Sequence, residues 1–257
     1  MAKVISFVSQ KGGVGKTTSA VNLATALAFG GYTALLIDLD PQGSIRVSMG
    51  VEKAANHGTK ELFTQPDLSI KELTRETDQE NLEFIFSNID NIKIERETDD
   101  IAHDPRFLNN RILEIANDYD FIIIDAPAST NSLAVNAIYA SDLIILPLQC
   151  ETLAVKSLKR FLVSFNELQL QLTDKNLRLA GILLTMYDRT ISVHRKVSKQ
   201  LYQSLSDSVF NTIIPRNDAI IEASALGRSV ITYRLGSIGS TAYIRLADEL
   251  LDKFRLR

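Results

Sequence analysis

Short apolar runs alternate with stretches of helical periodicity along most of this 257-residue chain. The apolar runs, each of strand length, occupy residues 4–8, 33–39, 121–125, 143–148 and 180–185. Apolar residues recur at helical spacing over residues 20–28, 105–117, 131–141, 152–171, 193–205 and 240–254. Continuous apolar runs are typical of strands buried on both faces, and strand–helix alternation is typical of parallel sheets. The pattern therefore predicts an α/β fold with a mainly parallel, twisted sheet flanked by helices on both faces.

The composition excludes several classes of protein. No apolar run approaches the roughly 18 residues of a membrane span, and the first strand begins so near Met1 that we expect no signal peptide. The single cysteine, Cys150, excludes an internal disulfide framework, and its apolar surroundings predict an inert core thiol. No internal repeat or linker divides residues 1–257. We therefore expect a cytoplasmic protein of one domain.

The net charge of −3 hides an uneven distribution of charged side chains. Residues 61–120 carry 6 basic and 16 acidic side chains, a net of −10. Residues 151–200 carry 9 basic and 4 acidic side chains, a net of +5. A basic zone can steer an anionic polymer toward a protein, but the same charges also suit a solvated helical face, so the charge pattern leaves both interpretations open.

The strongest chemical signal follows the first apolar run. Residues 10–18 read Gln-Lys-Gly-Gly-Val-Gly-Lys-Thr-Thr, between a predicted strand and a predicted helix. Glycines there let backbone N–H groups approach phosphate oxygens, and the helix N-terminus adds N–H donors and a positive dipole end. Lys16 would reach the β- and γ-phosphates, and the Thr17 hydroxyl would ligate Mg²⁺. The strict phosphate-loop pattern has a glycine where this chain has Gln10.

A second lysine makes this loop resemble a particular family. The residues Lys11, Gly12, Gly13, Val14, Gly15, Lys16, Thr17 and Thr18 resemble the deviant Walker A motif of the ParA/MinD ATPases. That resemblance implies ATP and Mg²⁺ as cofactors and a homodimer whose two subunits sandwich two nucleotides. It also implies that Lys11 reaches across the dimer interface to the nucleotide of the other subunit.

Two further strands end in carboxylates. The run 33–39 leads into Asp38-Leu39-Asp40-Pro41-Gln42-Gly43, and the carboxyl edge of a parallel sheet is where ligands bind. The stretch resembles the family's second motif, which implies that Asp40 positions the attacking water and that Asp38 lies near Mg²⁺ and Lys16. The run 121–125 ends in Asp125, the Walker B pattern, so Asp125 would hold Mg²⁺ through water.

The C-terminal third resembles the family's base-binding and closing segments. Met186 begins a stretch similar to the family's loop after the strand 180–185. Pro215, Arg216 and Asn217 resemble the motif that contacts adenine, and an asparagine side chain can hydrogen-bond a purine. The last helix, from residue 240, could be an amphipathic membrane anchor, but the resemblance favours core packing. We therefore expect no stable membrane association.

The residues that would contact DNA are indicated less strongly. Arg189 matches a position used by DNA-binding family members, and Arg195, Lys196 and Lys199 share one side of a predicted helix whose Val193 would face inward. Where many relatives carry another arginine, this chain has Ala219.

The resemblance covers the chain from about residue 3 to 250 and is closest to the small ParA-like members called Soj. It implies a weak, partner-stimulated ATPase with Lys11, Lys16 and Asp40 as catalytic residues. In its ATP form the dimer would bind DNA non-specifically and segregate a chromosome, plasmid or protein cargo with a ParB-like partner. The alternative is a MinD-like or orphan switch whose dimer binds a protein or a membrane. An ATP-coupled metabolic enzyme is a third, more distant alternative.

Overall fold

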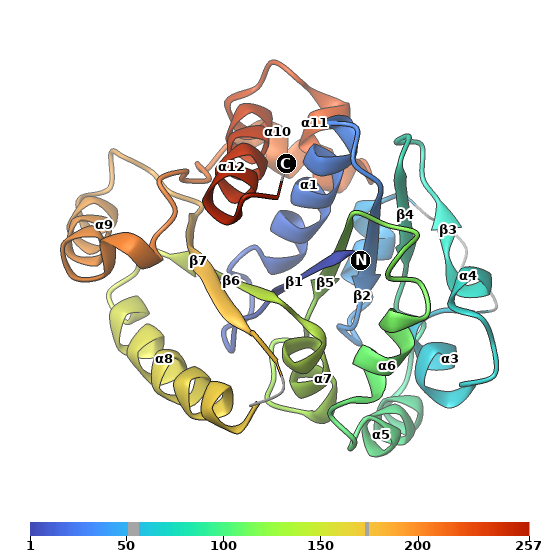
Figure 1. Cartoon of the computed structure of the whole chain (residues 1–257). Helices are drawn as coiled ribbons and strands as arrows, with labels where there is room; N and C mark the ends of the chain where they lie inside the picture. The colour runs from blue at the N-terminus through green and yellow to red at the C-terminus, as the bar shows by residue number, and fades with distance from the viewer. Residues whose placement is uncertain (51–56, 173–174, 257) are drawn as a thin grey trace.

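A seven-stranded sheet runs through the centre of the molecule (Figure 1). The computed structural model describes residues 1–50, 57–172 and 175–256. The strand order is β3-β4-β2-β5-β1-β6-β7, and every pairing is parallel except that of β3 with β4. The mainly parallel α/β architecture predicted from the sequence is confirmed.

The strands span Lys3–Phe7 (β1), Ala34–Asp38 (β2), Arg75–Glu76 (β3), Leu82–Ile85 (β4), Phe121–Asp125 (β5), Leu143–Gln149 (β6) and Arg178–Thr185 (β7). The helices span Lys16–Phe29 (α1), Ser44–Ser48 (α2), Thr59–Thr64 (α3), Ile70–Leu73 (α4), Ile92–Ile101 (α5), Phe107–Leu113 (α6), Ser132–Ala140 (α7), Ala154–Gln171 (α8), Ser192–Leu205 (α9), Asp218–Ala225 (α10), Val230–Tyr233 (α11) and Ile238–Phe254 (α12).

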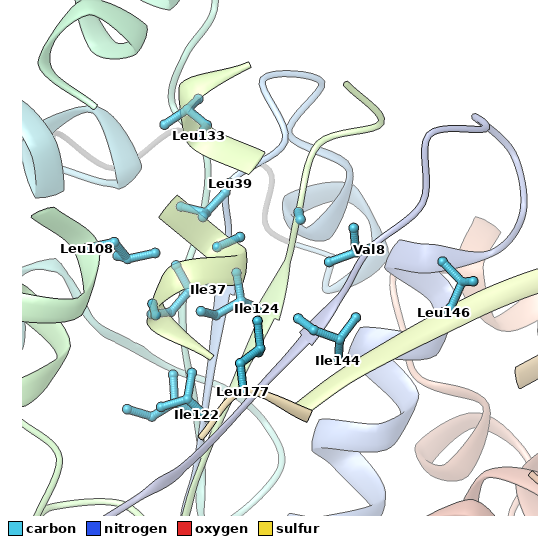
Figure 2. Packing of buried hydrophobic residues seen from close by; sticks show 14 of the residues in the cluster. Val8, Ile37, Leu39, Leu108, Ile122, Ile124, Leu133, Ile144, Leu146 and Leu177 are labelled. Atoms are coloured by element: carbon cyan, nitrogen blue, oxygen red, sulfur yellow. The ribbon is translucent and has the colours of Figure 1, made fainter. Parts of the chain in front are cut away.

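The sheet has a hydrophobic core on each face. Along β5, Ile122 and Ile124 belong to one core, whereas Phe121 and Ile123 belong to the other. This alternation follows from the period of two residues in a strand. Figure 2 shows the first core, where Ile122 and Ile124 pack with side chains from neighbouring strands and from helices such as α6 and α7. Helices α1, α10, α11 and α12 cover the second face (Figure 1).

The closing helix α12 packs beside α1 (Figure 1). Leu246 and Leu250 of α12 are fully buried, and the buried hydroxyl of Tyr243 hydrogen-bonds that of Ser19 on α1 at 3.3 Å. The predicted core packing of this helix is therefore confirmed. In the part of the chain that the structure describes, we find no helix both long and apolar enough to cross a membrane.

Two helical predictions are wrong in detail. The stretch 105–117 forms only α6, because after Leu113 the backbone tightens into i→i−3 hydrogen bonds, such as Ile115 N–H to Ile112 O at 3.1 Å. Val193 does not face inward: it lies in the first turn of α9 and is 40% exposed, whereas Val197 one turn later is buried.

Cys150, directly after β6, is fully buried in the first core. Burial raises the pKa of its thiol to about 11, because an apolar environment disfavours the thiolate. An inert core thiol, as the sequence predicts, fits this environment.

Candidate nucleotide-binding site

The loop between β1 and α1 lies at the carboxyl edge of the sheet. Gly15 is the N-cap of α1 with φ of 85°, and Gly13 has φ of 73°. Both angles lie in the left-handed region, which glycine adopts without the strain that a Cβ would cause. The loop thus delivers the N-terminus of a 14-residue helix, with its unpaired N–H groups, to the sheet edge.

Two side chains hold carbonyl groups of this loop. The Gln149 amide donates to the Gly13 carbonyl at 3.2 Å, and the Thr185 hydroxyl donates to the Val14 carbonyl at 2.8 Å. Gln149 ends β6 and Thr185 ends β7, and the two residues are partners in the sheet register. The ends of two adjacent strands therefore fix the loop from one side.

Thr17 and Asp125 meet beneath the start of α1. The Thr17 hydroxyl donates to Asp125 Oδ2 at 2.5 Å. The other carboxylate oxygen, Asp125 Oδ1, is buried and has no hydrogen-bond partner among the described residues. An unpartnered buried carboxylate oxygen beside a threonine hydroxyl suits an oxygen-ligated cation or its bound water.

Asp38 lies opposite Asp125 in the parallel pairing of β2 with β5. Its carboxylate accepts the backbone N–H groups of Asp40 at 3.0 Å and of Ile45 at 3.1 Å, so Asp38 organises the turn that leads into α2. Asp40 follows in that turn, where its own carboxylate accepts the Gln42 N–H at 3.0 Å.

The electrostatics of this group favour a cation. Burial, followed by the charge of Asp125, raises the pKa of Asp38 well above its ordinary value. Burial also raises the pKa of Asp125, although the Thr17 hydrogen bond and the charge of Lys16 oppose the rise. Lys16 is itself buried. Asp125 and Asp40 both raise the pKa of Asp38 by their charge, and Asp40 does the same to Asp125, so a divalent cation at Asp125 would relieve the excess of negative charge.

The Lys11 side chain reaches the carboxyl end of β6. Its Nζ lies 2.6 Å from Oε2 of Glu151, which follows β6, and 3.5 Å from Oε1 of Gln149, the last residue of that strand. Lys11 and Glu151 are each about half exposed. The second lysine of the motif is therefore held at the surface of its own subunit, apart from Lys16.

A cavity of about 700 Å³, which we call the base pocket, opens beside the loop. It is lined by residues from the loops, the strand ends and helices α1, α10 and α12: Gly15, Thr18, Gln149, Thr185, Met186, Ile214, Pro215, Arg216, Asn217, Ile220, Ile221, Ser224, Ala225 and Tyr243. The structure thus gathers Met186 and the segment 215–217 beside the phosphate loop, although about 30 residues separate them in sequence.

Asn217 brings an amide side chain to the wall of the base pocket. Asn217, at the N-cap of α10, has a buried Oδ1 without a hydrogen-bond partner in the described part of the chain. Pro215 is fixed by parallel pairing with Tyr187, where Arg216 N–H donates to the Tyr187 carbonyl at 2.9 Å. An amide side chain at an apolar wall can recognise the polar edge of a flat ring.

The basic residues singled out for DNA lie elsewhere, on the loop after β7 and on α9. Arg189, Arg195, Lys196 and Lys199 are exposed, and Arg195 Nη1 donates to the Arg189 carbonyl at 2.7 Å. Ala219 is only 2% exposed and packs in the second core. Its position therefore offers no surface for an arginine to contact DNA without a change in packing.

The sequence reasoning missed Gln149, Glu151 and Thr185. All three follow or end strands that were predicted, at the sheet edge where ligands bind in parallel α/β folds. That general rule was the available signal, but no familiar motif pointed to them.

The chain is similar to known proteins over almost its whole length. Residues 2–179 match the family model described as an AAA domain. The chromosome partitioning protein ParA of Caulobacter vibrioides is 35% identical over 257 residues, which cover 99% of this chain and 96% of that protein. The sporulation initiation inhibitor protein Soj of Bacillus subtilis is 36% identical over 251 residues, 97% of this chain and 98% of that protein. A solved structure, cobyrinic acid a,c-diamide synthase from Mycobacterium smegmatis with bound ADP and magnesium, is 29% identical with a TM-score of 0.82, over 99% of this chain and 96% of that chain.

Proposed function

This chain belongs to the family of ParA and Soj partition ATPases, and on that premise we propose that it is an ATP-dependent, dimerising switch. The observation that carries the proposal is the pairing of Thr17 with Asp125, whose second oxygen is buried and unpartnered. This pair lies at the start of a helix that follows a glycine-rich loop, as a site for Mg²⁺ and a nucleoside triphosphate requires.

In this proposal ATP and Mg²⁺ are the cofactors. Thr17 ligates Mg²⁺, and Asp125 holds it through water. Lys16 and the N–H groups of the loop bind the phosphates, and the base enters the pocket beside Asn217. Asp40 orients the attacking water, and Asp38 supports that turn through its two backbone hydrogen bonds.

Lys11 gives the switch its dependence on a second subunit. In the single chain it pairs with Glu151 at the surface. In the ATP-bound homodimer it leaves that partner and neutralises charge on the phosphates of the other subunit. Hydrolysis, stimulated by a ParB-like activating protein, removes the group that Lys11 binds and separates the dimer.

The proposed output is non-specific DNA binding in the cytoplasm, on the nucleoid, with a chromosome, plasmid or protein complex as cargo. The exposed side chains of Arg189, Arg195, Lys196 and Lys199 support it. The alternative is a dimer that binds a protein or membrane, and buried Ala219 favours that alternative because one expected basic position is absent.

DNA binding by the purified protein with ATP, with ADP and without nucleotide, across a salt series, tests this output. We expect binding that requires ATP, weakens steeply with salt and is lost in Lys196→Glu. Lys93→Glu, in the acidic segment 61–120, serves as the control and should bind DNA as the unsubstituted protein does. If the ATP dimer forms but does not bind DNA at low salt, DNA binding is not the output. ATP-dependent binding to liposomes would then support the alternative of a dimer that binds a membrane.

A further inference from the structure

Gln149 lies between two cavities and lines both of them. One is the base pocket. The other is a groove of about 400 Å³, here called the lysine groove, which runs from Lys11 and Glu151 along the start of α8. Gln149 is partly buried at the last position of β6, so a rigid strand fixes its backbone.

The amide nitrogen of Gln149 fixes the phosphate loop. It donates to the Gly13 carbonyl, while the Thr185 hydroxyl donates to the next carbonyl, that of Val14. In a trans peptide the C=O and N–H groups point in opposite directions. Holding these two carbonyls on one side therefore turns the N–H groups of Val14 and Gly15 to the other side, where successive N–H groups can bind an anion.

The same amide also contacts Lys11 and the base pocket. Gln149 Oε1 accepts a hydrogen bond from Lys11 Nζ at 3.5 Å, next to the shorter pair with Glu151. Gln149 Nε2 additionally contacts Met186 Sδ, which lines the base pocket. One side chain thus contacts the phosphate loop, a base-pocket residue and the lysine that must reach a second subunit.

We propose that Gln149 is a positioning residue that sets the phosphate loop and retains Lys11 in its own subunit until the nucleotide binds. This inference rests on the proposed function, because it requires a loop that binds nucleotide and a Lys11 that changes partner. An amide suits both tasks, since it donates to a carbonyl and accepts from an ammonium. A carboxylate accepts only, and a leucine does neither.

Two substitutions separate the tasks. Gln149→Leu and Gln149→Glu both remove the donor to Gly13, so each should weaken ADP binding by about 3- to 10-fold, the effect of one neutral hydrogen bond. ADP is the probe because its binding can be measured without the ATP dimer. Gln149→Glu also places a second carboxylate beside Lys11, so at saturating ATP it should dimerise less than Gln149→Leu, where Glu151 alone holds the lysine.

Calorimetry with ADP and light scattering with ATP measure the two effects. The controls are Gln171→Leu and Gln171→Glu, at the exposed end of α8, which should behave as the unsubstituted protein does. ADP affinities of both Gln149 variants within twofold of the control values would overturn the role at the loop. Equal dimerisation of the two Gln149 variants would overturn the role at Lys11. Failure of the unsubstituted protein to bind ADP or to dimerise with ATP would instead refute the proposed function.

Discussion

At the scale of single residues, Asp125 carries a carboxylate in surroundings that oppose its charge. Burial and the charge of Asp40 raise its pKa to about 7, against the lowering effects of Thr17 and Lys16. Between about pH 4, the ordinary carboxyl range, and pH 7, the folded protein therefore keeps a proton that the unfolded chain has lost. The free energy of unfolding of the nucleotide-free protein should accordingly fall as the pH rises through this window.

Asp125→Asn should remove much of this pH dependence. At pH 8, without nucleotide or Mg²⁺, we expect the variant to be more stable by on the order of 1–3 kcal/mol, because residue 125 then carries no buried charge. Urea denaturation between pH 5 and 8 measures the effect. Asp67→Asn, at an exposed aspartate, should retain the slope of the unsubstituted protein. Equal slopes for the Asp125 and Asp67 variants would contradict the prediction.

Lys11 should matter for the dimer rather than for binding in one chain. Its Nζ pairs with Glu151, so Lys11→Ala should leave ADP affinity within about threefold of normal, since an exposed ion pair contributes little. The same variant should lose ATP-dependent dimerisation and about 10²–10³ of the stimulated hydrolysis rate. Light scattering and phosphate release measure these quantities. Lys93→Ala, which removes a comparable exposed pair with Glu97, should leave both unchanged; normal dimerisation by the Lys11 variant would refute the cross-subunit role.

At the scale of elements, a backbone contact connects α2 with the end of α10. Gly227 has φ of 65°, and a Cβ added there would lie 2.3 Å from the Cα of Gly50, just after α2. Helix α2 follows the turn that contains Asp40. Helix α10 follows its N-cap Asn217, which lines the base pocket. The two ends of the nucleotide site are therefore joined by packing that only glycine permits.

Gly227→Ala should force these two segments apart. We expect a loss of about 1–3 kcal/mol in the free energy of unfolding, because the substitution adds strain at a positive φ as well as a clash. Nucleotide affinity should fall as well, since both segments border the site. Chemical denaturation and ADP calorimetry measure the two effects. Gly236→Ala is the control, because a Cβ there meets no atom within 4 Å; if both variants are equally stable, the contact has no energetic importance.

The elements also show where sequence reasoning succeeds. The runs ending in Asp38 and Asp125 were predictable because strands buried on both faces are continuous apolar segments. Helix α6 was predicted too long because helical spacing does not reveal where hydrogen bonds tighten. Gln149 and Thr185 escaped notice because each acts through a backbone carbonyl of a distant loop. Such contacts depend on register between strands, which one-dimensional patterns do not encode.

At the scale of the whole molecule, the charged segments lie toward opposite edges of the sheet. The acidic residues 61–120 include β3 and β4 at one edge, and the basic residues 151–200 include β7 at the other, followed by α9 (Figure 1). The small net charge therefore hides a separation of acidic and basic side chains across the molecule. This arrangement would turn the β7 edge toward a polyanion and make association sensitive to salt.

The buried thiol of Cys150 should react only when the molecule opens. At pH 8 we expect alkylation of the folded protein to be about 100-fold or more slower than alkylation of the urea-unfolded chain, because both the thiolate fraction and access are reduced. Quenched iodoacetamide labelling followed by mass spectrometry measures the rates. Comparable rates in the two states would show that the carboxyl end of β6 is open in solution.

Cys150 lies between Gln149 and Glu151, the two residues that hold Lys11. The labelling rate of Cys150 therefore reports how often this strand end opens, and no probe has to be added to the natural sequence. Nucleotide that tightens the strand end would slow the labelling of Cys150, and a partner that loosens the strand end would speed it. Because the chain has a single cysteine, the labelling of the intact protein measures the opening at this one site.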